Sequence, residues 1–158
     1  MRQLNKTLMV VLTVMISTMA IGCSDEEIAP EKVMTPSELL SSTAWETTNA
    51  KDNEGQDVDL SDPNVSNFVG YAYFKADGTF TMFNLDDSPK MKGDWTVSAD
   101  GQTRTIIAKN DQGETLFTRV VDITVLTKEE FTYRVHNGED KTIYFDIVHT
   151  PTDHQEPK

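Results

Sequence analysis

Short runs of hydrophobic residues alternate with polar clusters along most of the chain. From residue 44 onward, β-branched and aromatic residues are separated by Gly, Asn and Asp clusters, a pattern typical of strands joined by tight turns. Most connections are too short for parallel crossovers, so we expect neighbouring strands to pair antiparallel in sequence order. The pattern predicts strands near residues 44–49, 68–75, 80–85, 93–98, 103–109, 115–126, 130–136 and 142–149.

The last two predicted strands indicate their own register. Each has one apolar row, and pairing Val135 with Ile143 aligns the two rows around a loop of about five residues. The alternate positions of both strands are mixed polar, so one face is expected to be core and the other solvated. The apolar rows are Phe131, Tyr133, Val135 and Ile143, Phe145, Ile147.

About eight antiparallel strands with one buried face must hide their edges. We expect an all-β meander closed into a barrel; the alternative is a two-sheet sandwich, for which only the loop at residues 58–67 is long enough. Thr35 to Glu38 forms a capping-box pattern with Pro36 at the first helical position, which predicts a short N-terminal helix. The barrel domain is expected over residues 35–150, with a flexible tail at residues 151–158.

The first residues follow a different pattern. A positively charged start precedes an apolar run at residues 8–19, which is short for a bilayer span but suits a signal peptide. The junction Ala20-Ile21-Gly22-Cys23 resembles the lipobox at which bacterial signal peptidase II cuts before a diacylated cysteine. This resemblance implies that residues 1–22 are removed and that Cys23 carries acyl chains such as palmitate. The alternative is ordinary signal cleavage with Cys23 as a buried thiol.

The resemblance at Cys23 also implies a location. The protein is expected to be exported and lipid-anchored to the bacterial cell envelope, at the outer membrane if the organism is Gram-negative. Residues 23–34 are acidic and lack apolar periodicity, which predicts a disordered tether between lipid and barrel. Two acyl chains suffice for stable anchoring.

Charge narrows the range of partners. The formal net charge of the whole chain is −12, and removal of the signal peptide takes two basic residues away. Nucleic acid is therefore not expected as a partner, because phosphate binding needs a basic surface. With Cys23 acylated no thiol remains for a disulfide, so the fold must rest on an apolar core. A single monomeric domain is expected.

Three motifs in order resemble a known family. They are Leu39-Leu40 before Ala44-Trp45, the run from Phe74 to Phe80 containing Asp77-Gly78-Thr79, and Gly93-Asp94-Trp95. This order resembles the lipocalin-like domains of bacterial lipoproteins. The stretch from Val121 to Tyr133 is most similar to the uncharacterised family DUF4822. The resemblance implies a calycin-type barrel over about residues 39–149 and supplies no activity.

Catalytic motifs are missing from the sequence. No Ser-His-acid arrangement or Gly-rich phosphate loop is discernible, so we expect neither an enzyme nor a cofactor. The acidic loop at residues 52–62 lacks the order of a calcium loop and is expected to be solvated. His136, His149 and His154 match no metal-ligand spacing, so no metal is expected and they are interpreted as surface residues.

Arg119 is the one charged residue in the apolar row of its predicted strand. It either lies at the barrel rim and reaches water, or lies in a pocket and pairs with the carboxylate of a lipid-like ligand. The first functional hypothesis is a barrel whose interior or mouth binds a small apolar or amphiphilic molecule. The alternative is an envelope interaction or inhibitor protein with a filled barrel and an acidic protein-binding face. Candidate wall residues beside Arg119 are Tyr71, Tyr73, Phe83, Trp95, Phe117 and Tyr133.

Overall fold

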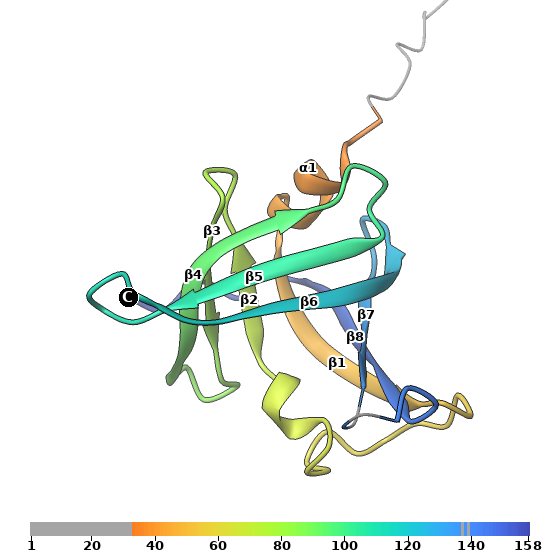
Figure 1. The fold of residues 1–158 in the computed structure, drawn as a ribbon. Helices are drawn as coiled ribbons and strands as arrows, with labels where there is room; N and C mark the ends of the chain where they lie inside the picture. The colour runs from red at the N-terminus through yellow and green to blue at the C-terminus, as the bar shows by residue number, and fades with distance from the viewer. Residues whose placement is uncertain (1–32, 137, 139) are drawn as a thin grey trace, which may run out of the picture. The chain divides into compact units, whose positions relative to one another are not determined.

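Eight strands form a closed barrel in the computed structural model, which describes residues 33–136, 138 and 140–158. Each strand pairs antiparallel with the next, and β8 pairs with β1 to close the barrel (Figure 1). The predicted antiparallel meander barrel is confirmed, and the sandwich alternative is wrong. The strands are β1 (Ala44–Asp52), β2 (Tyr71–Phe74), β3 (Thr79–Phe83), β4 (Pro89–Val97), β5 (Thr103–Lys109), β6 (Thr115–Leu126), β7 (Phe131–His136) and β8 (Tyr144–Thr152).

Two short helices lie in the described part of the chain, outside the strands. Helix α1 (Pro36–Ser41) precedes β1, and a 3-10 helix, η1 (Ser66–Phe68), lies in the loop between β1 and β2. Figure 1 shows them toward opposite ends of the barrel. The predicted signal peptide, the lipobox cysteine and most of the tether lie outside the described residues.

Helix α1 forms at the predicted capping box. The Thr35 hydroxyl accepts a hydrogen bond from the Glu38 amide at 3.3 Å, and the Glu38 carboxylate accepts one from the Thr35 amide at 2.8 Å. Leu40 is fully buried, and its carbonyl accepts a hydrogen bond from the Trp45 indole at 2.9 Å. The helix therefore packs against this end of the barrel, which we call the α1 end.

The register of the last hairpin differs from the prediction by two residues. Val135 pairs with Phe145, not with Ile143. The Asp140 carboxylate accepts hydrogen bonds from the amide and hydroxyl of Thr142, at 2.9 and 2.7 Å, and this turn keeps Thr142 and Ile143 out of the strand. Because a shift of two preserves the facing of side chains, the predicted core row stays inside while Ile143 is exposed.

The C-terminal boundary also differs from the prediction. Pro151 and Thr152 belong to β8, and the residues after them lie against β2 and β3. The His154 ring stacks on Tyr71 with centroids 3.9 Å apart, and its Nδ1 lies 2.6 Å from the Tyr73 hydroxyl. Glu156 accepts hydrogen bonds from Lys75 at 2.9 Å and Thr81 at 2.6 Å. Residues 153–158, which make up most of the predicted flexible tail at residues 151–158, thus form a strap with specific side-chain contacts.

The packing of Gly93 explains why the motif Gly93-Asp94-Trp95 begins with glycine. It pairs with Phe80 on β3, its φ is 157°, and a Cβ there would overlap the Ile107 carbonyl oxygen on β5. Gly93→Ala is therefore expected to lower the free energy of unfolding by about 3 kcal/mol or more, since the methyl must displace backbone. Urea denaturation measures the loss.

Gly113→Ala is the matched control for this substitution. Gly113 also has positive φ, 82°, but a Cβ there meets nothing within 4 Å. Only the conformational cost of about 1–2 kcal/mol applies. Equal losses in the two variants would contradict the close approach of β4 and β5 at Gly93.

Candidate functional site

Aromatic side chains fill the barrel toward the α1 end. Trp45 packs edge-on against Phe131 with ring centroids 5.8 Å apart, and Phe74 lies 5.2 Å from Trp95. The Trp95 indole donates a hydrogen bond to the Lys75 carbonyl at 3.0 Å. This half of the barrel is packed core, so Trp95, a predicted wall residue, lies in the core, and its remaining exposed edge lines a hollow beside α1.

A small pocket opens toward the opposite end, beneath η1 and the residues that follow it. Its enclosed space is about 20 Å³, which holds about one water molecule. We call it the mouth pocket. No Asp or Glu lines it, and its wall includes Phe68, Met82, Lys90, Met91, Arg104, Ile106, Arg119, Tyr133 and His149.

Three cations face the mouth pocket without an acidic partner. Arg104 is buried, whereas Lys90 and Arg119 are half-buried. Within the described residues none of the three forms a salt bridge; the Lys90 ammonium donates to the Val69 carbonyl at 2.6 Å. In a chain of net charge −12, this makes the pocket a local concentration of positive charge.

Arg104 lies in a cage of aromatic rings. Its guanidinium carbon is 4.4 Å from the Tyr133 ring centroid, 5.4 Å from that of Phe131 and 5.6 Å from that of Phe74. Burial lowers the pKa of Arg104, nearby Tyr133 opposes this, and the positive charge of Arg119 adds to it. Its Nε is buried with no hydrogen-bond partner, so the side chain keeps one unsatisfied donor beside the pocket that it lines.

Arg119 lies where the pocket meets solvent. Its guanidinium is 5.3 Å from the Phe68 ring centroid and 5.1 Å from that of Phe117. Burial lowers the pKa of Lys90, and the charge of Arg119 lowers it further. The Arg119 side chain is thus partly exposed and also lines the pocket. It combines features of the rim and pocket alternatives.

His149 completes the inner wall, and the prediction of a surface residue is wrong for it. Its exposed fraction is 3%, its ring stacks on Tyr133 with centroids 5.2 Å apart, and its Nδ1 lies 3.2 Å from the Phe131 carbonyl oxygen. Burial, together with the charges of Arg104 and Lys90, lowers the pKa of His149 to about 3. His149 is therefore neutral near pH 7, with Nδ1–H as the donor to Phe131.

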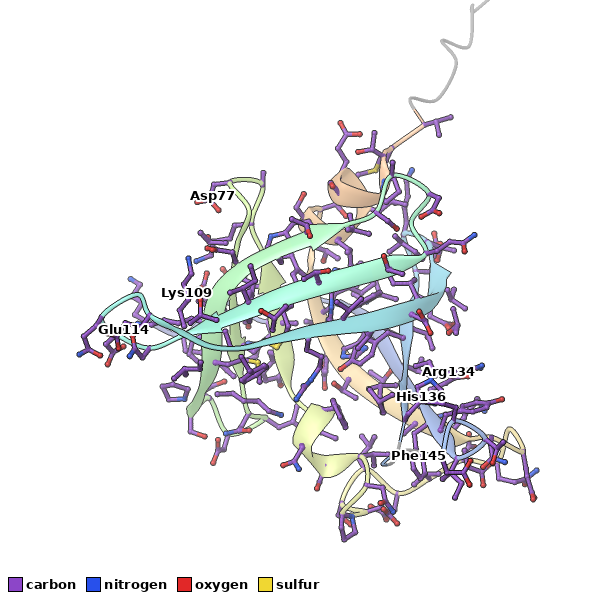
Figure 2. The ribbon with its side chains drawn as sticks, in the orientation of Figure 1. Asp77, Lys109, Glu114, Arg134, His136 and Phe145 are labelled. Carbon is purple, nitrogen blue, oxygen red and sulfur yellow. The ribbon has the colours of Figure 1, made fainter. Side chains whose placement is uncertain are left out.

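Arg134, outside the mouth pocket, shows how a paired arginine differs. Its Nε and Nη2 donate to the two Asp146 carboxylate oxygens at 2.8 and 2.9 Å, a bidentate ion pair on neighbouring strands. Figure 2 shows Arg134 projecting beside His136 near the β7–β8 loop. The Arg134 guanidinium also lies 3.6 Å from the Tyr144 ring centroid. Its charge is neutralised, in contrast to those of Arg104 and Arg119.

A larger groove adjoins the mouth pocket. It has a volume of about 580 Å³, is open to solvent, and shares four wall residues with the pocket: Met82, Phe83, Lys90 and Met91. Lys109, labelled at the end of β5 in Figure 2, lies on its wall. We call it the hairpin groove because it lies between the β3–β4 and β5–β6 hairpins. Its other wall residues include Pro89, Leu116, Phe117, Pro157 and Lys158.

The predicted ligand residues divide between these sites. Arg119, Tyr71, Phe83 and Tyr133 contribute to the mouth pocket, and Phe117 to the hairpin groove. Tyr73 contacts the C-terminal strap instead, through His154.

Sequence reasoning missed Lys90, Arg104 and His149. Arg104 alternates with Ile106 and Ala108, the same signal of a charge in an apolar row that singled out Arg119. His149 likewise continues the apolar row of Phe145 and Ile147. Lys90 has no such signal.

Two further features of the described part of the chain concern metal binding and membrane crossing. No group of three His, Cys, Asp or Glu side chains there is arranged to hold a metal ion. No helix among these residues has the length and apolarity needed to cross a membrane.

The fold and pocket define a lipocalin-like barrel, since a closed up-and-down meander of eight strands is the lipocalin architecture. Residues 37–158 match the domain of unknown function DUF4822, and the chain belongs to that family. No curated protein matches the sequence. The resemblance to lipocalin-like DUF4822 domains is thereby confirmed.

Similar solved structures include two at low identity. One is a lipocalin-like protein from Bacteroides uniformis ATCC 8492, with 13% identity and a TM-score of 0.48 over 72% of this chain and 99% of that chain. The other is the selenomethionine derivative of a biogenic amine-binding protein, with 13% identity and a TM-score of 0.41 over 71% of this chain and 64% of that chain.

Proposed function

We propose that this protein is an exported, lipid-anchored binding protein for a small anionic amphiphile. The mouth pocket holds the anionic head group, and the apolar chain lies in the hairpin groove. The observation that carries the proposal is the set of three cations, Lys90, Arg104 and Arg119, that face one pocket without an acidic partner. Keeping Arg104 buried, and Lys90 and Arg119 half-buried, without an acidic partner costs free energy, which an anion would offset.

The place of the apolar chain follows from volume. The enclosed pocket has room for about one water molecule, so an acyl chain cannot enter the barrel without repacking it. The hairpin groove is larger, shares a wall with the pocket, and carries the exposed apolar side chains Leu116 and Phe117. An amphiphile with its head at Arg119 can therefore lay its chain along Phe117.

The charge of the pocket also argues against cationic ligands. A biogenic amine, which one structural neighbour binds, would bring a further positive charge to Lys90, Arg104 and Arg119. We therefore do not propose an amine ligand for this protein.

The filled barrel interior also supports the second candidate function, an envelope interaction or inhibitor protein. With little enclosed space, the domain would also suit an envelope interaction or inhibitor protein that meets a basic partner through its acidic surface. Native mass spectrometry of protein purified from its own host separates the two. A retained small anion supports the binding function, and a ligand-free mass with a co-purified basic protein supports the alternative.

Lipid anchoring is the second part of the proposal. Its support is Cys23, the single cysteine of the chain, at a lipobox-like junction after an apolar signal segment. The acidic stretch that follows would hold the barrel away from the bilayer.

Arg119→Met is expected to weaken dodecanoate binding by about 10- to 150-fold, because a hydrogen bond to a charged group contributes about 1.5–3 kcal/mol. Isothermal titration of the purified protein measures the change. Thermal stability without ligand should stay equal or rise, since Met keeps much of the apolar stem and removes an unpaired cation.

Lys51→Met is the matched control for Arg119→Met. Lys51 pairs with Asp57 at 2.7 Å on the surface, and both side chains are substantially exposed. Its removal takes away one positive charge without touching the pocket, so dodecanoate affinity should not change. Equal affinities of wild type and Arg119→Met would remove Arg119 as a ligand residue and leave the rim interpretation.

A further inference from the structure

We infer that the mouth pocket selects a doubly charged oxyanion head group, such as a phosphomonoester, over a monocarboxylate. This inference rests on the proposed function and specifies the class of its head group. It is carried by the number of charges, the number of free donors and the burial of Arg104.

The charges facing the pocket exceed what one carboxylate neutralises. Arg104 and Arg119 are guanidinium ions, which stay protonated in proteins, and Lys90 adds a third cationic group. No Asp or Glu lines the pocket, and none of the described acidic side chains forms a salt bridge with these three residues. A phosphomonoester carries a charge of about −1.5 to −2 near pH 7, which matches the two guanidinium ions.

The hydrogen-bond donors lead to the same head group. Arg104 has a buried Nε without a partner. Arg119 makes no hydrogen bond to other described residues, so its donors are available to a ligand, and Lys90 donates to Val69 and retains further N–H groups. A phosphomonoester offers three strong acceptor oxygens, one more than a carboxylate, and can bind guanidinium groups bidentately.

Burial makes the charge match matter energetically. The exposed fraction of Arg104 is 2%, and aromatic rings surround its guanidinium. In such surroundings the interaction between charges is much stronger than in water. A monocarboxylate that pairs with Arg119 at the opening would leave Arg104 uncompensated. A dianion that enters from the opening and reaches both Arg104 and Arg119 compensates both, and the side chains at the opening must repack to admit it because the enclosed space holds about one water molecule.

The test compares ligands with one apolar chain and different heads. Dodecyl phosphate, dodecanoate and inorganic phosphate are titrated into the purified full-length protein by calorimetry near pH 8. Dodecyl phosphate is expected to bind at least about ten-fold more tightly than dodecanoate, as one additional charge-assisted contact implies. Inorganic phosphate is expected to bind more weakly than dodecyl phosphate, because it cannot use the hairpin groove.

Two further measurements test whether the preference for dodecyl phosphate over dodecanoate depends on Arg104 and on the second phosphate charge. Arg104→Met should abolish the preference for phosphate while dodecanoate still binds, and Lys51→Met should leave the preference intact. In wild type, dodecyl phosphate affinity should rise from about pH 5 to about pH 8, as the second phosphate proton with a pKa near 6 is lost. The dodecanoate profile should not show this rise, and this comparison needs no folded variant.

The outcomes separate this inference from the proposed function. Dodecanoate affinity equal to or greater than that of dodecyl phosphate overturns the dianion inference and leaves the proposed function standing. Binding of neither amphiphile overturns both. Inorganic phosphate binding as tightly as dodecyl phosphate supports the dianion site, identifies free phosphate as the source of the head group, and overturns the role of the hairpin groove.

Discussion

Lowering the pH from about 7 to about 4 is expected to remove about 3 kcal/mol of folding stability through His149 alone. Burial and the charges of Arg104 and Lys90 lower the pKa of this imidazole from 6.5 to about 3 in the folded protein. Below pH 6.5 the unfolded chain binds a proton that the folded chain does not. The contribution of His149 is therefore fully present above the unfolded pKa and is lost as pH falls toward the folded value.

The groups packed around His149 support a lowered pKa for its imidazole. Arg104 and Lys90 disfavour the imidazolium, whereas hydrogen bonding to the Phe131 and Ile147 backbone favours it but does not outweigh burial. Tyr133 stacks on the ring and excludes water. No carboxylate lines the mouth pocket to stabilise a positive imidazolium.

His149→Asn isolates this contribution. The Asn amide can still donate to the Phe131 carbonyl but carries no titratable group. Guanidinium denaturation at several pH values should show that the stability difference between wild type and variant shrinks by about 3 kcal/mol between about pH 7 and about pH 4. His136→Asn is the control, since its ring packs on Tyr144 outside the pocket. A difference that stays constant with pH would show that His149 is not held neutral.

Cys23→Ala is expected to move the protein completely from the membrane fraction to the aqueous fraction. Two acyl chains on Cys23 would be the attachment, because a strongly acidic chain has no attraction for anionic lipid. The thermal midpoint of the barrel should not change. Metabolic labelling with palmitate of cells expressing each form, followed by fractionation, measures the effect.

Ser24→Ala is the neighbouring control for this substitution. It lies one residue after the proposed attachment point and should leave labelling and fractionation unchanged. A Cys23→Ala protein that still sediments with membranes and resists extraction without detergent would contradict lipid anchoring.

The cationic residues of the mouth pocket show which parts of the site can be predicted from the sequence. A charge in an apolar row signals an unusual environment, and that signal selected Arg119. The shorter row of β5 gives the same signal at Arg104, whose burial the structure reveals. Lys90 could not be found, because its place at the pocket depends on the loop after η1, where the Val69 carbonyl accepts a hydrogen bond from its ammonium. Periodicity places side chains on a face but does not measure the space between opposite faces.

The last hairpin shows a second limit. Alternation of apolar and polar residues has a period of two, so it distinguishes registers that differ by one residue but not by two. The choice between Ile143 and Phe145 as partner of Val135 was made by the turn at Asp140 and Thr142. The buried face was therefore predictable from β7 and β8, whereas the loop length depended on local hydrogen bonds.

The separation of charge between the barrel surface and the mouth pocket has a consequence for encounter rates. At long range an approaching anion meets the field of a molecule with net charge −12, which repels it. Only within about one Debye length of Lys90 and Arg119, roughly 8 Å at physiological salt, does the local field dominate. Salt therefore acts in two opposite ways, because it screens the repulsion that slows arrival and weakens the attraction that retains the bound anion. Under the proposed function, this arrangement of charge would favour anions that insert at the mouth pocket over anions that only contact the acidic surface.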